Sequence, residues 1–95
     1  MAAKIIWSPR AVHNLEEICN FIAYDSEKYA KIFAQRIFAA IEDIADFPEI
    51  GRIVPEYHRP EIREKLLGKY RIVYRMTDEV IEIITVTHGS SRIKT

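Results

Sequence analysis

Three cations share one face of a short apolar segment that follows Gly68. Lys69, Arg71 and Arg75 occupy alternate positions, because their residue numbers differ by two, four or six, and aromatic and aliphatic residues stand between them. Successive side chains of a β-strand point to opposite faces, so this spacing gathers the cations on one face. A strand needs only one apolar face to fold, so the cationic face is available for binding or catalysis. The opposite face carries Tyr70, Ile72, Tyr74 and Met76.

RNA cleavage is the reaction that these residue types could carry out. Attack of a 2′-hydroxyl on the adjacent phosphate needs a base, an acid for the leaving oxygen, and cations for the developing charge. Arg71 and Arg75 could stabilise that charge, His88 could transfer a proton, and Glu56 could act as a base if its loop folds back. A structural interpretation is also open, in which Arg75 forms an ordinary cross-strand ion pair with Glu82 and His88 faces water.

A β-hairpin should position these residues. The pattern predicts a strand up to Met76, a tight turn at Thr77-Asp78-Glu79, and a second strand over residues 80–88. A two-residue turn at Asp78-Glu79 sets the register, because a slip by one residue would mix the two faces. The predicted pairs are Arg75 with Glu82, Val73 with Ile84, Arg71 with Val86, Lys69 with His88, Met76 with Ile81, Tyr74 with Ile83, and Ile72 with Thr85.

This register predicts a partly open groove on the cationic face. Arg71 and Arg75 form its walls, and Val73, Ile84 and Val86 form its apolar floor. Such a groove suits an acidic, amphipathic peptide.

Two helices should precede the hairpin and cover its other face. Ser8 is a good N-cap and Pro9 suits the first helical position, so a first helix is predicted to about Tyr24, after a short strand over 4–7. A second helix is capped by Asp25 or Ser26 and ends at 47–48, where Phe-Pro stops it. The apolar positions at helical spacing are Ala11, Leu15, Ile18, Cys19 and Ile22, and then Ala30, Phe33, Ile37, Ala40, Ile41 and Ile44.

The elements together predict one α+β domain over residues 1–95. An antiparallel two-helix hairpin packs on one face of a small, mainly antiparallel sheet, in the order β-α-α-β-β-β. Residues 47–60 are expected to form a loop, and 61–67 a further strand. Gly51 and Gly68 are expected to supply turn geometry. Arg63 either braces the loop or joins the Arg71 patch.

Composition restricts the function further. The 95 residues carry 14 basic and 14 acidic side chains, whereas a protein that grips nucleic acid through phosphates usually has a basic excess. The single cysteine, Cys19, cannot form an internal disulfide, so we expect a reducing, cytoplasmic location. We expect no membrane segment, no signal peptide, no metal and no cofactor.

The order of several motifs resembles the RelE/ParE superfamily of type II toxin–antitoxin toxins, and within it the ParE, or plasmid-stabilisation, branch. The resemblance covers almost the whole chain, and it lies in the order and spacing of the motifs. These are Phe47-Pro48-Glu49-Ile50-Gly51-Arg52, Ile62-Arg63-Glu64, Tyr70-Arg71-Ile72-Val73-Tyr74-Arg75 and Val86-Thr87-His88-Gly89.

The resemblance implies a toxin that a cognate antitoxin holds inactive, in a complex that could be a heterotetramer. ParE-type members are associated with inhibition of DNA gyrase, and RelE-type members are ribosome-dependent endoribonucleases that cut mRNA. Many nucleases of the superfamily carry a tyrosine near the C-terminus. The residues after His88 include no aromatic side chain, although some relatives use a C-terminal histidine.

Three functions therefore stand open: a ParE-like gyrase inhibitor, which we favour, a RelE-like mRNA endoribonuclease, and a non-toxic relative that binds antitoxin. The catalytic candidates, should the chain be a nuclease, are His88, Arg71, Arg75 and Glu56. The predicted antitoxin-binding residues are Lys69, Arg71, Val73, Arg75, Ile84 and Val86. The candidates for contact with the target are Ile32, Arg36, Phe38, Arg92 and Lys94, with packing between the helices as the alternative role of Ile32 and Phe38.

Overall fold

Two serine side chains fix where the helices begin in the computed structural model, which describes residues 2–91 and 93. α1 covers Pro9–Asp25, and α2 covers Glu27–Asp46. The hydroxyl groups of Ser8 and Ser26 each accept a hydrogen bond from the backbone N–H three residues later. These bonds satisfy N–H groups that have no partner inside a helix. The predicted start at Ser8 is confirmed, and Ser26 rather than Asp25 caps α2.

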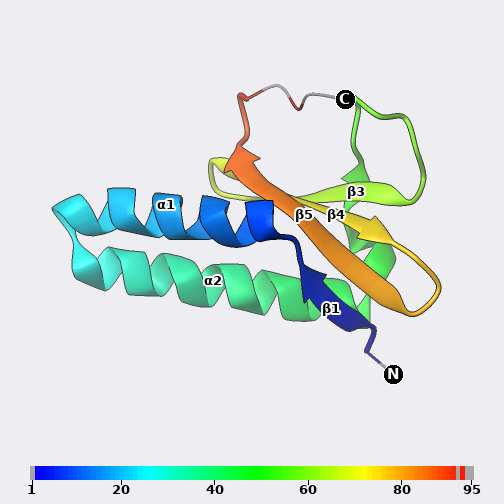
Figure 1. Ribbon diagram of the computed structural model, residues 1–95, viewed down its shortest axis with the longest axis horizontal. Coiled ribbons are helices and arrows are strands. Elements are labelled where there is room, and N and C mark those ends of the chain that lie inside the picture. The colour runs from blue at the N-terminus through cyan, green and yellow to red at the C-terminus, as the bar shows by residue number, and fades with distance from the viewer. Residues whose placement is uncertain (1, 92, 94–95) are drawn as a thin grey trace.

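Five strands form one sheet with the order β1-β5-β4-β3-β2. β1 runs parallel to β5, and the other neighbouring strands are antiparallel. The two helices lie side by side, and their connected end extends beyond the sheet (Figure 1). This arrangement confirms the predicted α+β fold. The bounds of the strands are β1 Lys4–Trp7, β2 Arg52–Ile53, β3 Ile62–Leu67, β4 Tyr70–Met76 and β5 Val80–His88.

The segment between α2 and β3 is more regular than a loop. A 3-10 turn, η1, covers Pro48–Ile50, and β2 pairs its two residues with Arg63 and Glu64 of β3. A strand of two residues is too short to show alternation in the sequence, which is why the prediction of a loop over 47–60 missed it.

Apolar side chains gather on both faces of the sheet. The larger core lies between the helices and the sheet and includes Ala11, Ile37, Ile72, Tyr74 and Ile83. A smaller cluster of Val54, Ile62 and Val73 lies on the opposite face, with Tyr57, Ile84 and Ile93 packed against it. The face that the sequence predicted to be an open groove is therefore partly filled by the chain itself.

The predicted register of the β4–β5 hairpin is correct near the turn and wrong beyond it. Arg75 pairs with Glu82, and Tyr74 pairs with Ile83, as predicted. The next pair is Val73 with Thr85, so Ile84 is an extra residue on β5, as in a β-bulge. The shift continues to the end of the strands, where the observed pairs are Ile72 with Val86, Arg71 with Thr87, and Tyr70 with His88.

Polar side chains from α1 and its N-cap form hydrogen bonds with the backbone at this bulge. The Ser8 hydroxyl donates to the carbonyl oxygen of Ile84 at 2.7 Å, and Oδ1 of Asn14 accepts from the backbone N–H of Val86 at 3.2 Å. Backbone groups displaced from the regular ladder thus keep hydrogen-bond partners. As a result Val86 belongs to the core under the helices, which corrects its predicted place in the groove floor.

The two turn glycines serve different purposes. Gly68 has φ of +57°, a conformation that favours glycine, as predicted for a turn. Gly51 has an ordinary φ of −78°, so its predicted role in turn geometry is wrong. A Cβ at Gly51 would lie 2.6 Å from both the carbonyl oxygen of Glu64 and the hydroxyl of Tyr74, so this position needs glycine for close approach. Neither of the two described α-helices carries the long apolar run that a membrane span requires.

We expect replacement of Ser8 by alanine to destabilise the protein more than replacement of Ser26. Both variants lose an N-cap, which costs about 1 kcal/mol. Ser8→Ala also leaves the carbonyl oxygen of Ile84 without its donor, which adds roughly another 1 kcal/mol. Urea unfolding of both variants measures the difference in the free energy of unfolding, provided that the dependence of this free energy on urea concentration is the same in both. Equal losses would show that the bond to β5 contributes nothing.

Candidate functional site

Arg71 is the second residue of β4 and is only 5% exposed. Its Nε donates to Oε1 of Glu64 at 2.7 Å, and its Nη1 and Nη2 donate to the two carboxylate oxygens of Glu56, each at 2.9 Å. Nη2 also forms an ion pair with Glu64. Paired hydrogen bonds of this kind between guanidinium and carboxylate are both strong and directional. Arg71 is therefore committed to two carboxylates of its own chain.

Arg52 completes this group, which we call the Arg71 cluster: Arg52, Glu56, Glu64 and Arg71. The pairing of β2 with β3 puts Arg52 opposite Glu64, and Nε of Arg52 donates to Oε2 of Glu64 at 2.6 Å. Glu64 is 1% exposed, so both of its oxygens need such donors. Two positive and two negative side chains balance within the cluster.

The cluster also holds the chain that follows β5. Nη1 of Arg71 donates to the carbonyl oxygen of Ser91 at 3.1 Å, and Oε2 of Glu56 accepts from the backbone N–H of Ile93 at 3.1 Å. The Ile93 side chain packs on the outer apolar cluster around Val73. The prediction of an open groove is therefore wrong at its centre, because Arg71 and Val73 are buried under this segment and the loop of Glu56.

The hydrogen bonds and charges of the cluster favour the ionised forms of Glu56 and Arg71. The hydrogen bond from Arg71 is the largest cause that lowers the pKa of Glu56 to about 2, and the backbone N–H of Ile93 lowers it further. Conversely, the hydrogen bond to Glu56 is the main cause that raises the pKa of Arg71. Because an effective general base has a pKa near the working pH, Glu56 is a weak candidate for that role.

Arg75 and Lys69, the other cations of the predicted groove, stay exposed. The Arg75 side chain is 51% exposed, and its Nη2 bonds Oε1 of Glu82 at 2.9 Å. This is the ordinary cross-strand ion pair that the structural interpretation predicted. Arg63 braces the loop, since its guanidinium donates to the carbonyl oxygens of Pro60 and Gly51.

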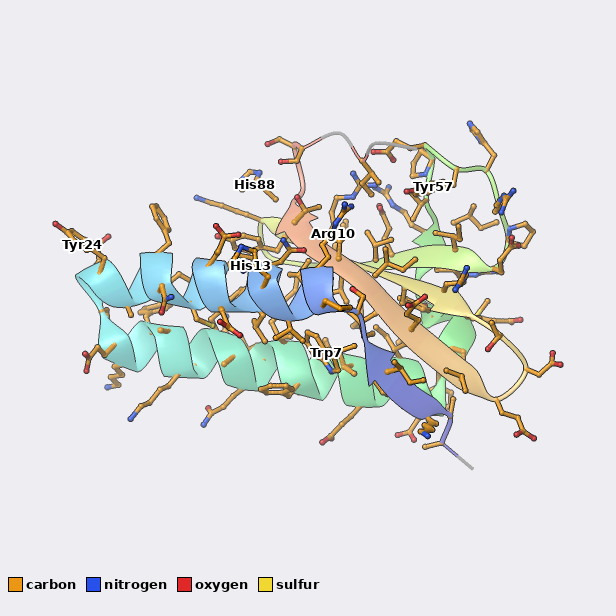
Figure 2. All side chains as sticks on the ribbon, in the orientation of Figure 1. Trp7, Arg10, His13, Tyr24, Tyr57 and His88 are labelled. Carbon is orange, nitrogen blue, oxygen red and sulfur yellow. The ribbon has the colours of Figure 1, made fainter. Side chains whose placement is uncertain are left out.

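His88 lies at the end of β5, above the helices in Figure 2. It is exposed and stands opposite Tyr70, not Lys69, with ring centroids 5.8 Å apart. Its Nδ1 lies 2.7 Å from the Ser90 hydroxyl and accepts from the Ser90 backbone N–H at 3.2 Å. Within residues 2–91 and 93, no hydrogen bond or ion pair joins His88 to Arg71 or Glu56. The four catalytic candidates are thus not assembled into one hydrogen-bonded site.

His88 lines a different feature, a hollow of about 330 Å³ between α1 and the end of β5, which we call the α1–β5 hollow. Reasoning from the sequence missed the contribution of α1, although polar and aromatic residues three or four apart beside the apolar stripe are the signal that could have found it. The lining residues are Asn14, Glu17, Ile18 and Phe21 from α1, with Tyr70, Val86, Thr87, His88 and Ser91.

The candidates for contact with a target are spread over α2. Arg36 lines a small hollow of about 160 Å³ with Lys69 and Tyr70, and Ile32 is half-buried. Phe38 is half-exposed and packs against Trp7, with ring centroids 6.0 Å apart. Arg92 and Lys94 lie outside the described residues. The described part of the chain shows no group of three or more metal-ligating side chains that could hold a metal ion.

Comparisons with known proteins agree on one family. A model of the ParE toxin of the type II toxin–antitoxin system parDE matches residues 5–93. The toxin RelE2 of Caulobacter vibrioides is 27% identical, and the alignment covers 93% of this chain and 97% of that protein. Y4kP of Sinorhizobium fredii, a candidate toxin, is 34% identical, with 90% of this chain and 88% of that protein covered.

Solved structures share the fold at low sequence identity. A chain of the chromosomal ParDE system from P. aeruginosa matches with a TM-score of 0.74 and 17% identity, covering 92% of this chain and 96% of that one. A chain of the RelBE2 toxin–antitoxin complex from Mycobacterium tuberculosis matches with a TM-score of 0.68 and 19% identity, covering 93% and 99%. A mutant of the E. coli toxin RelE in the free state matches with a TM-score of 0.63 and 17% identity, covering 95% of this chain and 86% of that one.

We expect Arg71→Met to be far more destabilising than Arg75→Met on the same strand. Removal of Arg71 leaves the buried carboxylate of Glu64 without its main partner, which costs about 3–5 kcal/mol. Removal of Arg75 breaks an exposed ion pair worth at most about 1 kcal/mol. Chemical unfolding measures both losses.

A double variant guards against the case in which Arg71→Met does not fold. Arg71→Met with Glu64→Met also removes the buried carboxylate, which Arg52 alone would otherwise have to compensate, so it should be more stable than Arg71→Met alone. Equal, small losses at positions 71 and 75 would contradict the assignment of Arg71 as a buried charge centre.

The stability of the protein should fall between about pH 4.5 and pH 2. The folded-state pKa of Glu56 lies at about 2, below its ordinary value of 4.5. A carboxylate with a lowered pKa stabilises the folded state above its unfolded pKa, and this contribution is lost as pH falls. Glu56→Gln should flatten this part of the pH profile of the free energy of unfolding. Glu61→Gln, in the exposed pair with Arg59, controls for the loss of one negative charge.

Proposed function

The chain belongs to the ParE family of toxins of type II toxin–antitoxin systems, and from this premise we propose that it is a cytoplasmic toxin that inhibits DNA gyrase and is neutralised by a cognate antitoxin. The toxin acts by binding, with no reaction of its own. The antitoxin acts as its inhibitor in a complex that forms a heterotetramer.

The state of Arg71 is the observation that carries the choice of gyrase over RNA. A nuclease needs free cations beside the reacting phosphate, together with a group whose pKa suits proton transfer. Here the Arg71 guanidinium is buried and shared by two carboxylates, and one of them, Glu56, has a pKa of about 2. A site of this kind neutralises its own cation, and the Arg71 guanidinium has no free donor left for a phosphate.

Overall charge supports the same choice. The chain has equal numbers of acidic and basic side chains, so it lacks the basic excess that binding to ribosomal RNA or mRNA favours. Binding to a protein target needs no such excess. The candidates for contact with gyrase are Ile32, Arg36 and Phe38 on α2, together with Arg92 and Lys94, which lie outside the described residues.

A ribosome-dependent mRNA endoribonuclease is the alternative, and His88 is the observation that favours it. This imidazole is exposed and lines the α1–β5 hollow with Tyr70, Glu17, Thr87 and Ser91. An accessible imidazole can transfer a proton near neutral pH. A relative that binds antitoxin without toxicity is the third reading, and it needs none of these side chains.

Induced expression should separate these functions. We expect wild-type toxin and His88→Ala to arrest growth equally, with early DNA damage, and purified toxin to inhibit the supercoiling activity of gyrase. The reason is that inhibition by binding does not use the imidazole. The measurements are the rates of DNA and protein synthesis after induction, mRNA integrity and gyrase supercoiling. Immediate translation arrest with cleaved mRNA, abolished by His88→Ala, would establish the nuclease instead, and no arrest at all would establish the non-toxic reading.

A further inference from the structure

The connected end of the helices carries aromatic side chains that the fold does not use. Phe21 is 75% exposed and Tyr24 is 92% exposed, and both lie on α1. Tyr24 stands at the far end of the helical hairpin, away from the sheet (Figure 2). Large exposed aromatic side chains are enriched where proteins bind other proteins. Phe21 is the more informative of the two, because it also lines the α1–β5 hollow.

The hollow has an apolar floor beside Phe21. Val86 is buried at its base, and Ile18 and Tyr70 are half-buried around it. The Tyr70 ring is held from below by an edge contact with Phe33 of α2, with ring centroids 5.1 Å apart. Tyr70 is therefore packed against the body of the protein, and the exposed Phe21 ring forms one wall of the hollow. This shape fits an inserted apolar or aromatic side chain.

Asn14 supplies a directional donor at the same place. Its Oδ1 accepts from the Thr85 hydroxyl at 2.6 Å and from the Val86 N–H, so the amide orientation is set by the bulge of β5. Its amide nitrogen donates to no described residue, and residues 2–91 and 93 contain no buried side-chain nitrogen or oxygen without a hydrogen bond. That nitrogen therefore reaches solvent, where it can donate to a backbone carbonyl of a bound peptide.

Charge at the rim selects the kind of peptide. Glu17 lines the hollow, and its exposed carboxylate lies 3.1 Å from Nε2 of His13. A carboxylate at the rim attracts a basic residue and disfavours a nucleic acid backbone. A second copy of the chain is a poorer occupant, because its acidic and basic side chains are equal in number and it brings no basic excess to this rim.

We propose that the α1–β5 hollow is the anchor point for the antitoxin. It takes an apolar or aromatic side chain of the antitoxin between Phe21 and Tyr70, with a neighbouring basic residue at Glu17. This inference rests on the proposed function for the identity of the partner. It replaces the antitoxin seat predicted from the sequence, since the loop of Glu56, together with Ser91 and Ile93, already covers Arg71 and Val73.

Two matched pairs of variants test the anchor point on purified full-length toxin and its antitoxin. Phe21→Ala should weaken the Kd at least about tenfold, as expected for a central aromatic anchor, whereas Tyr29→Ala, at an exposed aromatic residue of α2 outside the hollow, should leave it unchanged. Glu17→Lys should weaken the Kd and slow association, whereas Glu16→Lys, its neighbour outside the hollow, should do neither. Isothermal titration calorimetry and surface plasmon resonance measure these constants, and circular dichroism melts check folding.

Each other outcome overturns the inference. A Kd unchanged in Phe21→Ala and Glu17→Lys places the anchor elsewhere, and equal weakening in the control variants denies a localised site. If Phe21→Ala changes the oligomeric mass of the toxin in the absence of antitoxin, a second copy of the chain is the occupant. If Phe21→Ala weakens RNA binding and leaves antitoxin binding normal, RNA is the occupant. If Phe21→Ala does not fold, the comparison of Glu17→Lys with Glu16→Lys decides whether the hollow is the anchor point.

The binding measurements are independent of toxicity. A wild-type toxin that binds the antitoxin through this hollow but does not arrest growth refutes the proposed function and leaves the anchor point standing. A toxin that arrests growth and binds antitoxin with all variants unchanged refutes the anchor point alone.

Discussion

The pairing of Arg71 with two carboxylates is the constraint on which the outer face of the sheet depends. A guanidinium buried to this degree requires acceptors on every side, and they come from three places in the chain: the loop through Glu56, β3 through Glu64, and the segment after β5 through Ser91. Because these acceptors belong to distant parts of the sequence, the one side chain joins the loop, the sheet and the C-terminal segment. The hydrogen bonds that hold this face of the sheet together are therefore also the ones that neutralise the charge of Arg71.

This constraint also shapes the function. Once Arg71 is satisfied internally, the sheet presents little free positive charge, and the exposed Arg75 is itself paired with Glu82. The chemistry that remains accessible is at the ends of the strands and along α1, where His88, Glu17 and Phe21 surround one hollow. A toxin built in this way is suited to recognise proteins, which agrees with the proposed inhibition of gyrase and the proposed control by an antitoxin.

Local signals were reliable wherever a short stretch of sequence carried the whole determinant. Ser8-Pro9 and Ser26 set the helix starts, the apolar periodicity gave the buried faces, and Asp78-Glu79 fixed the register of Arg75 with Glu82. The prediction lost accuracy at Ile84, because the bulge there is accommodated by Ser8 and Asn14, which are about seventy residues distant along the chain. The sequence of β5 alone cannot indicate hydrogen bonds whose partners lie on α1 and its N-cap.

The sequence by itself therefore determined the fold class, the helices and their caps, the alternation of the hairpin strands, and the family resemblance, because each depends on residues close in the chain or on their order. Only the tertiary structure decided that Arg71 is buried and neutralised, that Val86 faces the helices, and that α1 forms a hollow with the end of β5. These features depend on which distant side chains meet, and a cation on a strand reads the same in sequence whether it faces water or two carboxylates.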